Sequence, residues 1–137
     1  MKILIVGEKD ASRAYLAELL TGEGYTVREC HNGQEALRTL YLQKYDMILS
    51  GIKMPRMTGI ELLKAVKALP EASQAPVVLI TEHASFDTAV EALRAGAYDY
   101  LLKPIDIKKL LGLVEEISRQ ISLKEKGYRI SPGRPVA

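Results

Sequence analysis

The chain has 137 residues, which is enough for one domain built around one hydrophobic core. Its net charge is +2, but residues 1–123 carry 15 basic and 16 acidic side chains, so the basic excess lies in residues 124–137. The folded part therefore has no basic stripe of the kind that marks a nucleic-acid binder. No apolar run approaches the roughly 20 residues that a membrane span needs.

The N-terminal segment and the single cysteine bear on the compartment. The opening MKILIVGEKD is too short for a signal peptide and lacks a cleavage site. One cysteine, Cys30, excludes an internal disulfide and a cysteine-based zinc site. These features lead us to expect a cytoplasmic protein without contact to a membrane.

Five short apolar runs alternate with segments of helical spacing. The first and fourth runs are apolar without alternation, as expected of strands covered on both faces, whereas the second is more polar and predicts an edge strand. Capping residues precede four of the helical segments. The runs are Ile3–Val6, Tyr25–Cys30, Met47–Leu49, Val77–Ile80 and Ala97–Leu102, and the predicted caps are Asn32, Thr58, Ser85 and Asp106.

Strict alternation of strand and helix predicts a parallel sheet with helices on both faces. At this size the expected fold is the flavodoxin-like (βα)5 three-layer sandwich with strand order 2-1-3-4-5. Ligands of such folds bind beyond the carboxyl ends of the strands. We expect residues 1–122 to form this domain and residues 123–137 to form a flexible tail or a linker to an effector domain.

The segments YDMILSGIKMPRMTGIELL and GAYDYLLKPID, together with KILIV and VVLITEHAS, resemble the receiver domain of two-component response regulators over about residues 2–122. The details are most similar to receivers of sigma-54-dependent transcription activators. The resemblance implies transfer of a phosphoryl group from a histidine kinase to an aspartate, with a divalent cation held by an acidic pair. It also implies a hydroxyl and a lysine that contact the phosphoryl oxygens, and a switch aromatic.

The family's functional positions carry over only in part. By this resemblance Thr81 is the hydroxyl, Lys103 the lysine, and Tyr100 the switch aromatic, and the Lys103–Pro104 peptide bond is expected to be cis. The acidic pair, however, reads Gly7–Glu8, and the phosphoacceptor position reads Gly51. Glycine offers no nucleophile.

Loss of these carboxylates removes the expected cation site. Magnesium requires a shell of hard oxygens, and Glu8 is the one carboxylate left beside Lys53 and Lys103. We therefore expect no metal and no cofactor. We predict instead an ion pair between Glu8 and Lys103, shared with Glu82 or Lys53, whose loss in Glu8→Ala destabilises the fold.

Several other residues have plain structural interpretations. His31 and His83 lack a second ligand at metal spacing. Asp10 is expected to cap or to balance the dipole of the first helix rather than accept a phosphoryl group. Tyr98 and Tyr100 share parity, so we expect them on one side of the sheet, where Tyr100 either packs or forms a partner surface.

The last helical stripe has two expected roles along its length. Leu110, Val114, Ile117 and Ile121 are spaced as one apolar face. We expect the start of this face to pack on the core. Its far end either ends the domain or pairs with a second copy in a homodimer.

The leading hypothesis is a non-enzymatic pseudo-receiver that takes part in a two-component phosphorelay and in transcription regulation through protein partners. The partners expected are a histidine kinase, an effector domain or a second receiver copy. One alternative is a phosphorylatable receiver with an unusual acceptor, or one in which Gly7 and Gly51 replace parental residues. Another is a flavodoxin-like enzyme that binds flavin or nucleotide, against which the loop GEKDAS lacks a phosphate-cradling glycine pattern.

Overall fold

The computed structural model describes residues 1–83 and 85–127 and consists of five strands and five helices in alternation. All neighbouring strands pair in parallel, in the order β2-β1-β3-β4-β5, which confirms the flavodoxin-like prediction. The elements are β1 (Lys2–Val6), α1 (Asp10–Gly22), β2 (Thr26–Cys30), α2 (Gly33–Leu42), β3 (Met47–Gly51), α3 (Gly59–Ala68), β4 (Val77–Thr81), α4 (Phe86–Arg94), β5 (Asp99–Leu102) and α5 (Ile107–Glu125).

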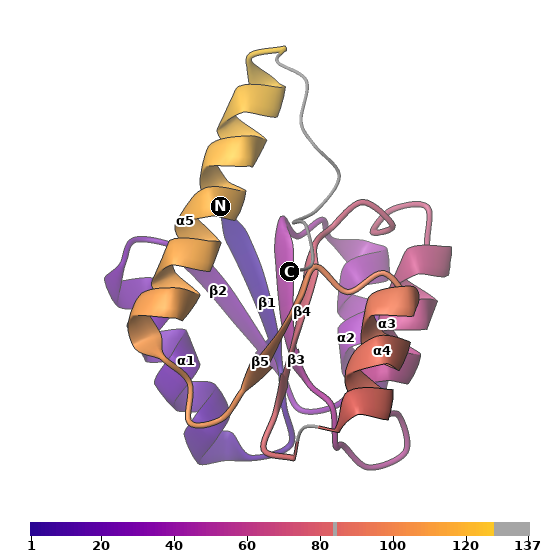
Figure 1. Ribbon diagram of the computed structural model, residues 1–137. Coiled ribbons are helices and arrows are strands. Elements are labelled where there is room, and N and C mark those ends of the chain that lie inside the picture. Colours follow the sequence, from indigo (N-terminus) through magenta and orange to yellow (C-terminus); the bar gives the residue numbers. More distant parts are fainter. Residues whose placement is uncertain (84, 128–137) are drawn as a thin grey trace.

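Two apolar layers hold the three-layer sandwich together. One layer packs α1 and α5 against one face of the sheet, and the other packs α2, α3 and α4 against the opposite face (Figure 1). The central strands β1, β3 and β4 alternate their side chains between the two layers and are almost fully buried. β2 lies at the edge, as its polar sequence predicts.

The predicted helix starts are confirmed. The side chains of Asn32, Thr58, Ser85 and Asp106 each accept a hydrogen bond from a backbone N–H in the first turn of their helix. Thr58 forms a full capping box with Glu61. α1 differs, because its N-cap is Lys9 and has no side-chain cap.

The last helix runs antiparallel to the strands and extends beyond the amino edge of the sheet (Figure 1). Leu110, Val114 and Ile117 are buried, as the stripe predicts, and Ile121 packs partly against the same layer. The helix continues to Glu125, and the remainder of the predicted tail, residues 128–137, lies outside the described residues. No helix within residues 1–83 and 85–127 is both long and apolar enough to cross a membrane.

Candidate functional site

The predicted site residues gather at the carboxyl edge of the sheet. Gly7 follows β1, Gly51 ends β3, Thr81 ends β4, and Lys103 follows β5. Backbone hydrogen bonds continue the strand register into these loops, from Gly7 N to the Cys30 carbonyl (3.0 Å) and from Lys103 N to the Thr81 carbonyl (2.8 Å). The sheet topology therefore places these positions at one edge, as the sequence predicts.

Gly7 and Gly51 each have room for a Cβ atom at a position where the family resemblance implies a carboxylate. A Cβ atom added to Gly7 would lie 3.9 Å from its nearest neighbour, Arg13 Cβ, and one added to Gly51 would lie 4.0 Å from Met54 Cγ. These are ordinary contact distances, and neither glycine has a positive φ angle. Local packing therefore does not require glycine at either position.

A close backbone approach lies beside the second glycine. Gly59, the first residue of α3, donates its N–H to the Ile52 carbonyl at 2.8 Å. A Cβ atom added to Gly59 would overlap the Gly51 carbonyl oxygen and lie 2.9 Å from Ile52 Cα. Gly59 thus lets α3 begin directly against the loop that follows β3.

Glu82 forms the main ion-pair centre of this edge. Its carboxylate lies 3.2 Å from Lys9 Nζ and 3.7 Å from Lys103 Nζ, and it thereby links the loops that follow β1, β4 and β5. The hydrogen bond and the charge of Lys9, with a smaller effect of Lys103, lower the pKa of Glu82. The Glu82 side chain is 45% exposed, so water screens both pairs and their contribution to stability is small.

The predicted ion pair between Glu8 and Lys103 does not form, whereas Glu82, one of the two residues predicted to share it, does pair with Lys103. Lys103 pairs with Glu82, and exposed Glu8 has no ion-pair partner within the described part of the chain. The reason lies in the strand order. β5 neighbours β4, whereas β1 is three strand positions away, or roughly 14 Å at the usual strand spacing. The carboxylate that follows β4 is therefore the one within reach.

Thr81 keeps its hydroxyl within its own loop. The side chain is buried, and its Oγ1 accepts a hydrogen bond from the His83 N–H at 3.1 Å and donates to the His83 carbonyl at 3.3 Å. Lys53, on the loop after Gly51, is exposed and forms no ion pair with any described residue. The Lys103–Pro104 peptide bond is cis, as the family resemblance implies.

The two tyrosines of the fifth strand region lie on opposite faces, which corrects the prediction of a shared side. β5 begins at Asp99, so Tyr98 precedes the strand and strand parity does not apply to it. Tyr98 packs with the layer of α1 and α5, and Tyr100 packs with the layer of α2, α3 and α4. The Tyr100 hydroxyl is buried and has no hydrogen-bond partner among the described residues.

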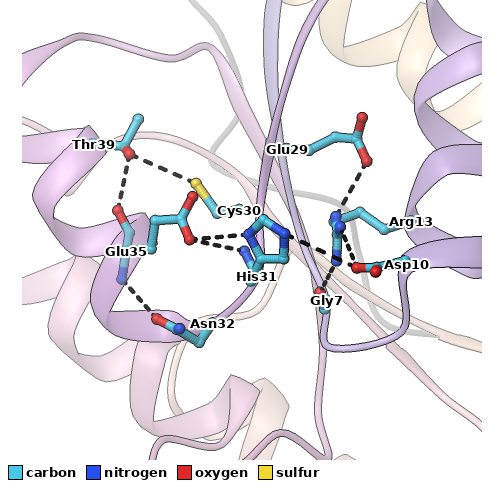
Figure 2. A network of polar contacts seen from close by, with 9 residues as sticks. All are labelled: Gly7, Asp10, Arg13, Glu29, Cys30, His31, Asn32, Glu35 and Thr39. Atoms are coloured by element: carbon cyan, nitrogen blue, oxygen red, sulfur yellow. Dashed lines mark hydrogen bonds and ion pairs between the residues drawn. The ribbon is translucent and has the colours of Figure 1, made fainter.

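A buried arginine supports the first loop of the site, and sequence reasoning missed it. The Arg13 guanidinium donates to the Gly7 carbonyl, to Asp10 Oδ1 (2.7 Å) and to Glu29 Oε1 (3.1 Å), and the side chain is only 6% exposed (Figure 2). Asp10 thus lies in the first turn of α1 as an ion-pair partner and not as the cap. Arg13, chiefly through its hydrogen bond, lowers the pKa of Asp10.

His31 extends this network toward α2. Its Nδ1 lies 3.2 Å from Glu35 Oε2, and its Nε2 lies 4.0 Å from Asp10 Oδ1 (Figure 2). Hydrogen bonds and charge from His31 outweigh the effect of burial and lower the pKa of Glu35. His31 therefore joins the first turns of α1 and α2. No group of three or more His, Cys, Asp and Glu side chains within residues 1–83 and 85–127 could hold a metal ion.

The arrangement defines a class of protein: a flavodoxin-like α/β domain whose carboxyl edge carries a threonine, a lysine before a cis proline, and lysine–carboxylate pairs. The family profile described as the response regulator receiver domain matches residues 3–115. The chain therefore belongs to the response regulator receiver domain family.

The curated relatives include regulators of transcription. The chain is 38% identical over 130 residues to the transcriptional regulatory protein ZraR of Klebsiella oxytoca, covering 95% of this chain and 29% of that protein. It is 39% identical over 113 residues to the DNA-binding transcriptional regulator NtrC of Escherichia coli K12, covering 82% of this chain and 24% of that protein. The chain thus spans less than a third of the length of these relatives.

Solved structures of receivers match the whole fold. The chemotaxis protein CheY4 of Vibrio cholerae is 30% identical with a TM-score of 0.80, covering 85% of this chain and 97% of that one. The signal receiver domain of a signal transduction histidine kinase from Syntrophus aciditrophicus is 30% identical with a TM-score of 0.77, covering 99% of this chain and 98% of that one.

Proposed function

We propose that this chain is a receiver module of a two-component system that has lost phosphoacceptor chemistry and acts by binding other proteins. The observation that carries the proposal is Gly51 at the carboxyl end of β3, where the family resemblance expects the acceptor aspartate. An acyl phosphate needs a carboxylate oxygen as its nucleophile. Glycine supplies none.

Neighbouring hydroxyls offer poor replacements. Ser50 is fully buried, and its hydroxyl donates to the Gly51 carbonyl at 2.8 Å. The Thr81 hydroxyl is engaged with the backbone of His83. A nucleophile must be presented to its donor and activated by a base within hydrogen-bond reach. No observation therefore favours a receiver with an unusual acceptor.

The charges at this edge also do not fit a resident magnesium ion. Magnesium is held by near-octahedral oxygen ligands, with carboxylates supplying the negative charge. Glu8 alone remains of the acidic pair, and Glu82 is paired with Lys9 and Lys103. We propose that the ammonium groups of Lys9 and Lys103 take the place of a cation beside the Glu82 carboxylate, and that the chain catalyses no reaction of its own.

The output proposed for the module is protein binding in signal transduction. The candidate partners are a histidine kinase, an effector domain or a second receiver copy. The similarity to regulators named for transcription and DNA binding favours an output in gene regulation. The near-neutral charge of residues 1–123 argues against direct DNA contact by this part of the chain. The single, buried Cys30 suits the reducing cytoplasm, where we place the protein.

The decisive experiment is labelling by a small phosphodonor. The wild-type chain is incubated with acetyl phosphate and magnesium, and its intact mass is measured. The proposal predicts no gain of mass. The matched control is the double variant Gly7→Asp/Gly51→Asp, which restores both carboxylates at positions where a Cβ atom meets only ordinary contact distances. It should gain one phosphoryl group. A phosphoryl gain by the wild-type chain would refute the proposal.

A further inference from the structure

A groove between α2 and α3 is lined mainly by apolar side chains. It has a volume of about 420 Å³ and is lined by Leu37, Arg38, Tyr41, Leu42, Ala65 and Leu69. Leu42 is 82% exposed and Tyr41 67% exposed, so no described residue covers them. Large apolar side chains left in water at one place mark an interaction site more often than scattered ones do.

The lining of the groove comes from two neighbouring helices. Leu37 and Tyr41 lie one helical turn apart on α2, and Ala65 on α3 lies four residues before the C-cap residue Leu69. The two walls of the groove therefore follow the neighbouring helices α2 and α3. An amphipathic helix that places apolar residues at helical spacing fits such a groove lengthwise.

The positive charge in and beside the groove indicates which kind of partner can bind there. Arg38 is the one charged residue in its lining, and it forms no ion pair with a described residue. Lys44, two residues after Leu42, is likewise exposed and without an ion pair in that part of the chain. A second copy seated symmetrically would bring two Arg38 side chains together without a lining carboxylate to balance them. An acidic partner balances Arg38 directly.

A second groove, between α3 and α4, is lined by equal numbers of basic and acidic side chains. It is about 470 Å³ in volume, and its lining includes Lys64, Asp87, Glu91 and Arg94. Lys64 and Glu91 form an ion pair at 3.7 Å. Its charges are thus matched internally, so it selects no partner charge.

We infer that the groove between α2 and α3 binds an acidic amphipathic helix of a partner protein. The inference rests on the proposed function in one respect, because it names a surface and a partner class for a module that acts by binding. The lining residues belong to the carboxyl-terminal parts of α2 and α3. These ends of the two helices lie at the amino edge of the sheet (Figure 1). The groove is therefore separate from the edge that carries Gly51.

The test uses a fluorescein-labelled peptide helix of about 18 residues, long enough to hold helical structure, with leucines along one stripe and glutamates elsewhere. Fluorescence anisotropy should show saturable binding to the wild-type chain. Leu42→Asp should weaken binding at least about tenfold, as expected for a central apolar contact. Arg38→Glu should weaken it by a similar factor. A peptide with lysine in place of glutamate should not bind.

The matched control is Phe86→Asp. Phe86 is 82% exposed, the same as Leu42, but lines the other groove. This variant should bind the acidic peptide as the wild type does, and thermal unfolding should show that all variants are folded.

Four results of the peptide experiment would overturn the inference. They are absence of saturable binding, equal binding of the lysine peptide, equal loss in Phe86→Asp, and binding unaffected by Leu42→Asp. A wild-type dimer that Leu42→Asp dissolves would assign the groove to a second copy instead. Binding to phosphatidylserine vesicles that Leu42→Asp abolishes would assign it to a membrane. Phosphoryl labelling fails or succeeds independently of all these results, so the two proposals can be refuted separately.

Discussion

Replacing Arg13 by methionine tests how the first loop of the site is held in place. The substitution keeps an apolar stem of similar length but removes the guanidinium that contacts the Gly7 carbonyl, Asp10 and Glu29. Breaking a fully buried ion pair costs about 3–5 kcal/mol. Glu29 is 39% exposed, so water recovers much of that cost. Loss of a hydrogen bond from a charged group, as to the half-buried Gly7 carbonyl, costs about 1.5–3 kcal/mol.

Because water reduces the first cost, the second range sets the size of the effect. We expect Arg13→Met to lower the free energy of unfolding by about 2 kcal/mol. Urea unfolding followed by circular dichroism should show it as a midpoint lowered by about 1 M with an unchanged slope. The matched control is Arg38→Met, which removes an exposed arginine without a described ion pair and should change stability by less than about 0.5 kcal/mol. Equal losses in the two variants would refute the reasoning.

The difference in stability between the wild type and Arg13→Met should depend on pH. Arg13 lowers the pKa of Asp10 below its ordinary value of 3.8 in the folded state. The resulting stabilisation is present above that value and is lost as the pH falls through the lowered pKa. The difference in stability between wild type and Arg13→Met should therefore narrow as the solution is acidified below about pH 4. A constant difference would contradict this cause.

The remaining predictions concern other single residues. Gly59→Ala should destabilise the fold by about 1–3 kcal/mol, because its Cβ overlaps the backbone after β3. In contrast, Gly112→Ala, at an open position of α5, should stabilise by about 0.5–1 kcal/mol, and urea unfolding of both variants checks this contrast. Glu8→Ala should leave the free energy of unfolding within about 0.5 kcal/mol of wild type, since Glu8 has no described ion pair. Carboxyl NMR titration should place the Glu82 pKa below 4.5, and Lys9→Met should move it back toward that value.

The fold could be predicted from the sequence because each of its determinants is local. Apolar runs give the buried strands, and side chains such as Asn32 and Thr58 mark helix starts within three residues of their partners. Strict alternation then restricts the topology to a parallel sheet. Strand boundaries were less secure, since the second run begins at Thr26 and not at Tyr25.

The partners within the site could be predicted only in part. Which lysine meets which carboxylate depends on the lateral order of the strands, and the predicted order already placed Glu82 beside Lys103 and Glu8 far from it. The strand order therefore favours Glu82, and not Glu8, as the partner of Lys103. The Arg13–Glu29 contact joins a helix to an edge strand, and no sequence spacing signals it. The face of Tyr98 depended on where β5 begins.

In the proposed module, the ammonium groups of Lys9 and Lys103, and not a divalent cation, neutralise the Glu82 carboxylate at the carboxyl edge. The most direct measurement is a magnesium titration of the wild-type chain followed by the amide NMR resonances of Gly7, Gly51 and Lys53. We expect these resonances to stay in place up to about 10 mM magnesium, tenfold above the dissociation constants of the weakest dedicated calcium sites. Saturable shifts of these three amides at lower concentration would contradict it.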